Sequence, residues 1–77
     1  MNIREQVLAI LKEVKPTKDL ESISNLIEGG YIDSFELMSL VTNLSEKFNI
    51  EITIDDLIPE NFNSVDAITA MVEKLKG

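Results

Sequence analysis

The sequence predicts an all-α protein, a small four-helix bundle with a long loop after the first helix. Its 77 residues are enough for one small domain. At four points we interpret an Asn, Asp or Thr followed three positions later by an acidic residue as a helix start. Apolar residues recur at helical spacing after three of these pairs. We therefore expect three main helices, roughly at 2–15, 34–48 and 64–76, and a short helix near 54–58.

The first helix has a clear start and a clear end in the sequence. Asn2 and Glu5 have the spacing of a capping box, in which each side chain bonds the other's backbone N–H. Pro16 ends the helix because a residue that precedes proline is pushed out of the α region. The apolar face between them is Ile3, Val7, Ile10, Leu11 and Val14.

Residues 16–32 are expected to form a long connection rather than a helix. Leu20, Ile23, Leu26 and Ile27 could line a short helix, but neighbouring Ser and Asn residues weaken it, and two adjacent glycines at 29 and 30 interrupt it. We expect its apolar residues to pack on the bundle, and long ordered loops in compact domains are often functional.

Three further helix starts are predicted, with capping pairs Asp33 and Glu36, Thr53 and Asp56, and Asn63 and Asp66. Pro59 should end the second of these helices within about two turns. Residues 50–54 alternate as a strand would, but no second strand is present to pair with them. The apolar face of the longer helix after Asp33 is Leu37, Met38, Val41, Leu44 and Phe48, with Leu40 on its edge. That of the last helix is Val65, Ile68, Met71, Val72 and Leu75.

Composition removes most catalytic chemistry. The chain has no Cys and no His, which excludes thiolate zinc sites, Cys nucleophiles and His general bases. Asp55, Asp56 and Glu60 do not match an ordered calcium loop, so no metal site is predicted. The net charge of −7 disfavours nucleic acid and favours basic protein surfaces as partners. No apolar run reaches a membrane-spanning length and the start does not resemble a signal peptide, so the cytoplasm is the expected compartment.

Ser34 is the candidate site residue. If Asp33 is the N-cap, Ser34 is the first helical residue, and its side chain faces solvent where free N–H groups favour a phosphate. Taken alone, the pattern also fits an ordinary solvated serine in a first helical turn.

The surrounding sequence resembles a known family. The run from Glu28 to Leu37, EGGYIDSFEL, is similar to the attachment motif of acyl carrier proteins, in which the serine after an aspartate receives phosphopantetheine from coenzyme A. The resemblance covers about fifty residues, as the ten-residue run is followed by matching positions in the second and last helices. These further positions are Leu40, Val41, Leu44, Glu46, Phe48, Glu51, Ile52, Asn63, Ser64, Val65, Ala67 and Ile68.

The resemblance implies a single, non-catalytic carrier domain over residues 1–77. Acyl or aminoacyl cargo would be held as a thioester on a phosphopantetheine arm attached to Ser34, and Asp33 would help to orient the metal-bound coenzyme A of the attaching enzyme. Phe35, Glu36 and Met38 would begin the docking face. The expected partners are a phosphopantetheinyl transferase, an adenylating or acyl-transferring loading enzyme, and downstream acceptor enzymes. The carrier itself is expected to be a monomer.

Some positions depart from the fatty-acid carriers of this family. Phe35 replaces the usual Leu or Met, and the outer face of the second helix is polar rather than acidic, with Ser39, Thr42, Asn43 and Ser45. The sequence is closer to D-alanyl carrier proteins and other stand-alone carriers. The alternative is a small helical interaction module without a prosthetic group, with Ser34 unmodified or phosphorylated. A hydrolase would lack a base of near-neutral pKa.

Overall fold

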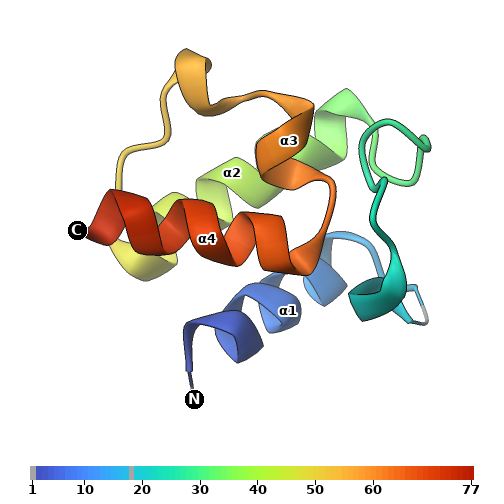
Figure 1. Ribbon diagram of the computed structural model, residues 1–77, viewed down its shortest axis with the longest axis horizontal. Helices are drawn as coiled ribbons and strands as arrows, with labels where there is room; N and C mark the ends of the chain where they lie inside the picture. Colours follow the sequence, from blue (N-terminus) through green and yellow to red (C-terminus); the bar gives the residue numbers. More distant parts are fainter. Residues whose placement is uncertain (1, 18) are drawn as a thin grey trace.

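The computed structural model describes residues 2–17 and 19–77, and these fold into helices and turns without any strand (Figure 1). The long helices are α1 (Ile3–Val14), α2 (Ser34–Phe48) and α4 (Val65–Lys76). Three short elements connect them, namely the single 3-10 turns η1 (Leu20–Ser22) and η2 (Ile54–Asp56) and the helix α3 (Pro59–Phe62). The predicted small helical bundle is confirmed, with main helices within one or two residues of their expected bounds.

One apolar core joins the three long helices. Helix α1 packs against both α2 and α4, and α3 packs on α4. Burial of each large aliphatic side chain contributes about 1.5–3 kcal/mol, so these contacts rather than helix propensity hold the small domain together. The buried helical residues are Val7, Ile10, Leu11, Leu40, Val41, Leu44, Phe48, Phe62, Val65, Ile68, Met71 and Val72.

The connection between α1 and α2 is a long loop whose apolar residues pack on the bundle, as predicted. Leu20, Leu26 and Ile32 are buried. The described part of the loop contains the 3-10 turn η1. The residue before this turn, Asp19, has a left-handed conformation with φ of 59°. Buried side chains at three points fix the path of this segment, although little of it is helical.

The predicted short helix near 54–58 is wrong in its bounds. Thr53 and Asp56 do form a capping box, but the helix stops after the single turn η2. Pro59 begins α3 instead of only ending the turn before it. Proline suits a first helical position, because its φ is preset and the N–H that it lacks would have no partner there.

The predicted cap of the last helix is also wrong. Ser64, not Asn63, is the N-cap of α4, and its hydroxyl oxygen accepts a hydrogen bond from the Ala67 N–H at 3.0 Å. Asp66 does not close a capping box but accepts a hydrogen bond from Arg4 Nε at 2.7 Å, and this bond raises the pKa of Arg4. The two residues thus tie α4 to α1.

None of the described helices is long and apolar enough to cross a bilayer; the longest, α2, has 15 residues.

Candidate functional site

The start of α2 is fixed by a complete capping box. Asp33 Oδ1 accepts a hydrogen bond from the Glu36 N–H at 2.7 Å, and Glu36 Oε1 accepts one from the Asp33 N–H at 3.1 Å. Asp33 itself is extended, with φ of −88° and ψ of 178°, so the chain turns sharply into the helix. The predicted box is confirmed, and Ser34 is the first helical residue.

The Ser34 side chain is free to react. Ser34 is exposed, and no described residue accepts or donates a hydrogen bond to its hydroxyl. The first N–H groups of a helix lack partners within the helix and carry the positive end of its dipole. A phosphodiester on Ser34 would therefore lie at a helix end that favours negative charge. The hydroxyl is exposed for such an attachment.

Glu36 also links the start of α2 to the end of α1. Its second carboxylate oxygen, Oε2, lies 3.6 Å from Lys15 Nζ. The side chain is only 24% exposed, and both of its oxygens have partners. The Glu36 carboxylate, expected both to close the capping box and to begin the docking face, is thus largely occupied in holding the helix start.

Two glycines allow the tight turn that leads to the site. A Cβ at position 29 would lie 2.6 Å from the backbone oxygen of Asn25, which is closer than carbon and oxygen approach. Gly30 has φ of 79°, a left-handed conformation that strains other residues. The adjacent glycines in the motif are therefore explained by close approach at one position and backbone conformation at the next.

Asn63 makes hydrogen bonds to the loop before the site that its predicted role as a helix cap did not reveal. Its Oδ1 accepts hydrogen bonds from the Ile27 N–H at 3.0 Å and the Glu28 N–H at 3.1 Å. Its Nδ2 donates to Glu28 Oε1 at 2.9 Å, and its backbone oxygen accepts from the Leu26 N–H at 2.8 Å. The signal that could have been used is the adjacent Ser64, an equally good N-cap that leaves Asn63 available.

The outer face of α2 beside Ser34 combines apolar and polar side chains. Phe35 is 81% exposed and Met38 is 53% exposed. The prediction of Met38 on the apolar face is therefore wrong, and Leu40, predicted at its edge, is fully buried. Phe35 and Met38 line a shallow groove together with Ser39, Thr42 and Asn43. This groove begins one residue after Ser34, so a protein that contacts it would be close to the serine.

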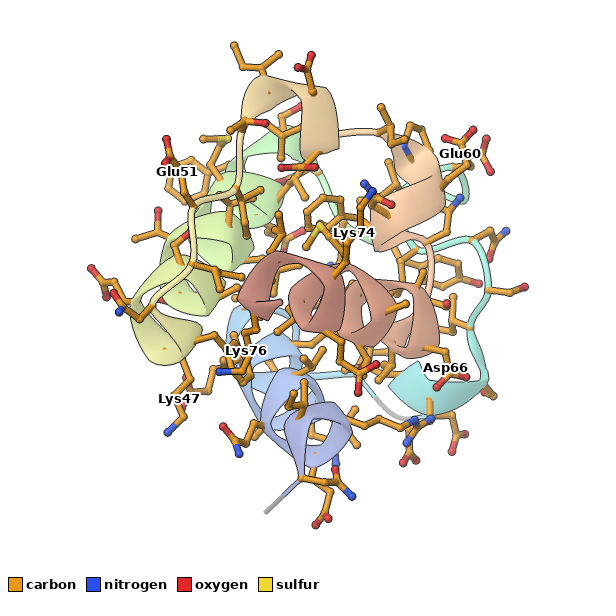
Figure 2. The ribbon with its side chains drawn as sticks, turned by 60° about the vertical axis from the view of Figure 1, so that its left-hand side comes forward. Lys47, Glu51, Glu60, Asp66, Lys74 and Lys76 are labelled. Atoms are coloured by element: carbon orange, nitrogen blue, oxygen red, sulfur yellow. The ribbon has the colours of Figure 1, made fainter. Side chains whose placement is uncertain are left out.

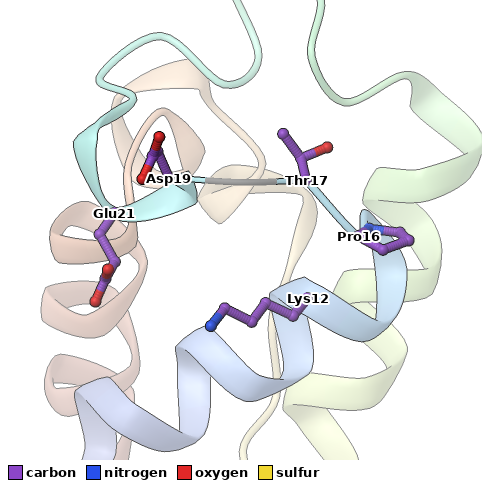
Figure 3. Close-up of a pocket in the computed structure, with 5 residues that line it drawn as sticks. All are labelled: Lys12, Pro16, Thr17, Asp19 and Glu21. Carbon is purple, nitrogen blue, oxygen red and sulfur yellow. The ribbon is translucent and has the colours of Figure 1, made fainter.

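Other hollows and acidic residues do not form a second site. A pocket between α1 and the following loop is lined by Lys12, Pro16, Thr17, Asp19 and Glu21 and includes no candidate site residue (Figure 3). The acidic side chains labelled in Figure 2 are dispersed, with Glu51 in the connection after α2, Glu60 on α3 and Asp66 on α4. No group of three potential ligands within residues 2–17 and 19–77 could hold a metal ion.

A small helical bundle with an exposed serine after a capping aspartate is the arrangement expected of a carrier protein. The family model for the phosphopantetheine attachment site matches residues 3–72, and the chain belongs to this family. It is also 33% identical to a D-alanyl carrier protein of Staphylococcus saprophyticus, over 99% of this chain and 100% of the relative. The protein is thus a carrier with covalent phosphopantetheine, which holds its cargo as a thioester, rather than an interaction module without a prosthetic group.

Proposed function

We propose that Ser34 is the attachment residue and that the carrier transports a small aminoacyl group between partner enzymes. The observation that carries the proposal is the exposed, unbonded hydroxyl at the first position of α2. In attachment, the serine oxygen forms a phosphodiester bond with the phosphopantetheine half of coenzyme A. The nucleotide half leaves, and the hydroxyl proton passes to a base of the transferase.

Asp33 has two compatible roles in this proposal. Oδ1 is used in the cap, whereas the carboxylate has further lone pairs and the residue is exposed. These lone pairs are available to the metal ion that accompanies coenzyme A on the transferase. Because the same side chain holds the helix start, the metal and the serine are presented in a fixed relation.

The cargo is proposed to be D-alanine or a similarly small amino acid. The relative that aligns over its whole length is a D-alanyl carrier protein. The chain has no thiol of its own, so a thioester-bound cargo depends on the phosphopantetheine arm. A flexible arm makes each visit to a partner effectively intramolecular, so the protein needs to catalyse nothing itself.

The partners follow from this cycle. A phosphopantetheinyl transferase attaches the arm, an adenylating enzyme loads the amino acid, and an acceptor enzyme removes it. We propose that these enzymes meet a monomeric carrier at the groove that begins with Phe35 and Met38, and that Glu36 contributes from the adjoining hollow. Attachment requires coenzyme A, which makes the cytoplasm the proposed compartment for this step.

Intact mass after incubation with coenzyme A, magnesium and a broad-specificity transferase tests the attachment residue. The native chain should gain one phosphopantetheine and the Ser34→Ala variant none. Ser24→Ala is a matched control, because Ser24 is an exposed serine of the preceding loop, and this variant should be modified like the native chain. Modification of Ser34→Ala, or an unmodified native chain with several transferases, would contradict the assignment.

The cargo is tested separately on the phosphopantetheine-loaded protein. With ATP, D-alanine and a D-alanine-adenylating enzyme, the mass should rise by one alanyl group, which hydroxylamine should remove as expected for a thioester. Loading by a fatty-acyl ligase in place of the D-alanine enzyme would show that the cargo, but not the carrier class, has been misassigned.

A further inference from the structure

Asn63 connects two parts of the chain that are distant in sequence. It lies between α3 and α4, yet its side chain and backbone receive or donate hydrogen bonds at three consecutive residues, Leu26, Ile27 and Glu28. Oδ1 uses both of its lone pairs on backbone N–H groups, and Nδ2 holds the Glu28 side chain. The Asn63 side chain thus makes three hydrogen bonds to a part of the loop that is not in a regular helix.

The hydrogen bonds continue from Asn63 to the residue before the site. The Leu26 N–H is bonded to Asn63, and the Leu26 oxygen in turn accepts a hydrogen bond from the Ile32 N–H at 3.1 Å. Leu26 is fully buried and Ile32 is 4% exposed, so both ends of this small loop are held in the core. Asp33 and Ser34 follow Ile32 directly. The bond to Leu26 comes from the backbone oxygen of Asn63, and the Asn63 side chain adds the bonds to Ile27 and Glu28, the next two residues of the loop that leads into α2.

Asn63 is itself held rigidly. The preceding residue, Phe62, is 1% exposed and ends α3 in the core, and the following residue, Ser64, caps α4. The helical part of α2 does not depend on Asn63, because its first turn is closed by Asp33 and Glu36 and its inner face is buried. Loss of the Asn63 side chain would leave α2 formed and would remove three hydrogen bonds at Ile27 and Glu28, whereas the backbone bond to Leu26 would remain.

We propose that Asn63 is a positioning residue for phosphopantetheine attachment, because its side chain holds Ile27 and Glu28 in the loop that presents Ser34 to the transferase. The proposal rests on Ser34 as the attachment residue. An enzyme that reaches Ser34 must also pass residues on both sides of it, including Tyr31 and Phe35, which are exposed. A loop that samples several positions presents this surface correctly only part of the time, and small misplacements of reacting groups reduce rates strongly.

The first test compares Asn63→Ala with Asn61→Ala. Asn61 is a matched control because it lies two residues away and donates one side-chain hydrogen bond, to the Asp56 oxygen at 2.8 Å, outside the loop. In Asn63→Ala, amide hydrogen exchange should accelerate roughly tenfold or more at Ile27 and Glu28 but not within α2. The kcat/KM of the transferase for this variant should fall about tenfold, while Asn61→Ala should load like the native chain. Thermal melts would confirm that both variants are folded at the assay temperature.

The second test asks whether loading can be restored by rebuilding the contact. In the native chain, Glu28 Oε1 accepts a hydrogen bond from Asn63 Nδ2 at 2.9 Å. Asn63→Asp keeps an acceptor for both N–H groups but places a second carboxylate against that of Glu28. Adding Glu28→Gln supplies a donor again. The double variant should load within about twofold of the native rate, and Asn63→Asp alone should be slower, since a restored pair recovers coupling that either change removes.

Two results would overturn the proposal: native loading of Asn63→Ala, or a double variant no faster than Asn63→Asp. Either can be recognised only if the native chain is modified and Ser34→Ala is not, so failure of the attachment assignment is distinguishable from failure of the positioning role.

Discussion

At the scale of single residues, two neighbours divide the work at the helix start. The Asp33 carboxylate caps the helix by accepting a hydrogen bond from the Glu36 N–H. The Ser34 hydroxyl makes no hydrogen bond to any described residue. Asp33→Ala should lower the free energy of unfolding by about 0.5–2 kcal/mol, because the Glu36 N–H loses its acceptor. Ser34→Ala should cost much less. Urea denaturation monitored by circular dichroism measures both.

The Glu36→Gln variant provides the control for this comparison. The amide oxygen can still accept the Asp33 N–H bond, so only the ion pair with Lys15 is lost, and partly exposed pairs contribute about 0–1 kcal/mol. Equal losses for Asp33→Ala and Ser34→Ala would mean that the serine, and not the aspartate, caps α2 in solution. Its hydroxyl would then be less available for attachment.

The sequence reveals residue roles that depend on neighbours three or four positions away, and it conceals the others. The Asp33–Glu36 box was predictable because both partners lie in one turn. Asn63 was assigned to a cap because the same local rule was applied, whereas its true partners are 35 and 36 residues away. No spacing rule reports a contact of that kind, since it depends on how the loop and the α3–α4 junction pack.

At the scale of elements, α2 has an inner face for the core and an outer face for partners. The outer face offers apolar Phe35 and Met38, whereas the nearby acid Glu36 is paired with Lys15. Apolar contacts are little affected by salt, but attraction between exposed charges is screened. Phe35→Ala should therefore lower the loading enzyme's kcat/KM by at least roughly tenfold, as expected for an apolar anchor, and Glu36→Gln should change it less.

The same loading assay should be repeated from low salt to roughly 0.3 M sodium chloride, where the screening length is shorter than about 10 Å. We expect less than about a twofold change in rate if apolar docking dominates. Ile54→Ala is the matched control, since Ile54 is equally exposed but lies on η2 rather than α2. A rate that collapses with salt, together with greater damage from Glu36→Gln, would favour charge-directed docking as in a fatty-acid carrier.

Element bounds were predictable where capping and apolar periodicity agree, as in α1 and α2. They failed at the segment between α2 and α4, where a capping box at Thr53 has too few apolar positions behind it to sustain a helix. Pro59 was interpreted as the end of a helix, although proline is also common at the first position of one. The burial of Phe62 in the folded protein favours a helix that begins at Pro59.

At the scale of the whole molecule, acidic side chains outnumber the basic side chains that could pair with them. The chain has 14 acidic and 7 basic side chains. Arg4 is paired with Asp66 at 2.7 Å and with Glu21 at 3.7 Å, and Lys15 with Glu36 at 3.6 Å. Lys76 Nζ instead lies 6.0 Å from the centre of the Phe48 ring. Figure 2 shows two further acids, Glu51 in the connection after α2 and Glu60 on α3.

Salt should consequently stabilise this protein rather than destabilise it. The screening length is about 30 Å at 0.01 M salt, comparable to the longest molecular dimension of 29 Å, so acids on all sides of the molecule repel one another. At roughly 0.3 M the screening length is below about 10 Å; long-range repulsion is then removed, whereas the ion pairs, at 2.7–3.7 Å, remain within it. The free energy of unfolding should rise by on the order of 1 kcal/mol between these conditions, because the expanded unfolded chain repels itself less.

The charge origin of this effect can be isolated with Glu51, an exposed acid for which no ion pair with a described residue exists. Glu51→Lys reduces the net negative charge by two and should stabilise the protein at low salt, with a smaller rise on adding sodium chloride. Glu51→Gln should lie between this variant and the native chain. Urea denaturation at each salt concentration gives the three curves. If stability instead falls with salt and the three proteins respond alike, the few ion pairs of Arg4 and Lys15 outweigh the repulsion among the remaining acids.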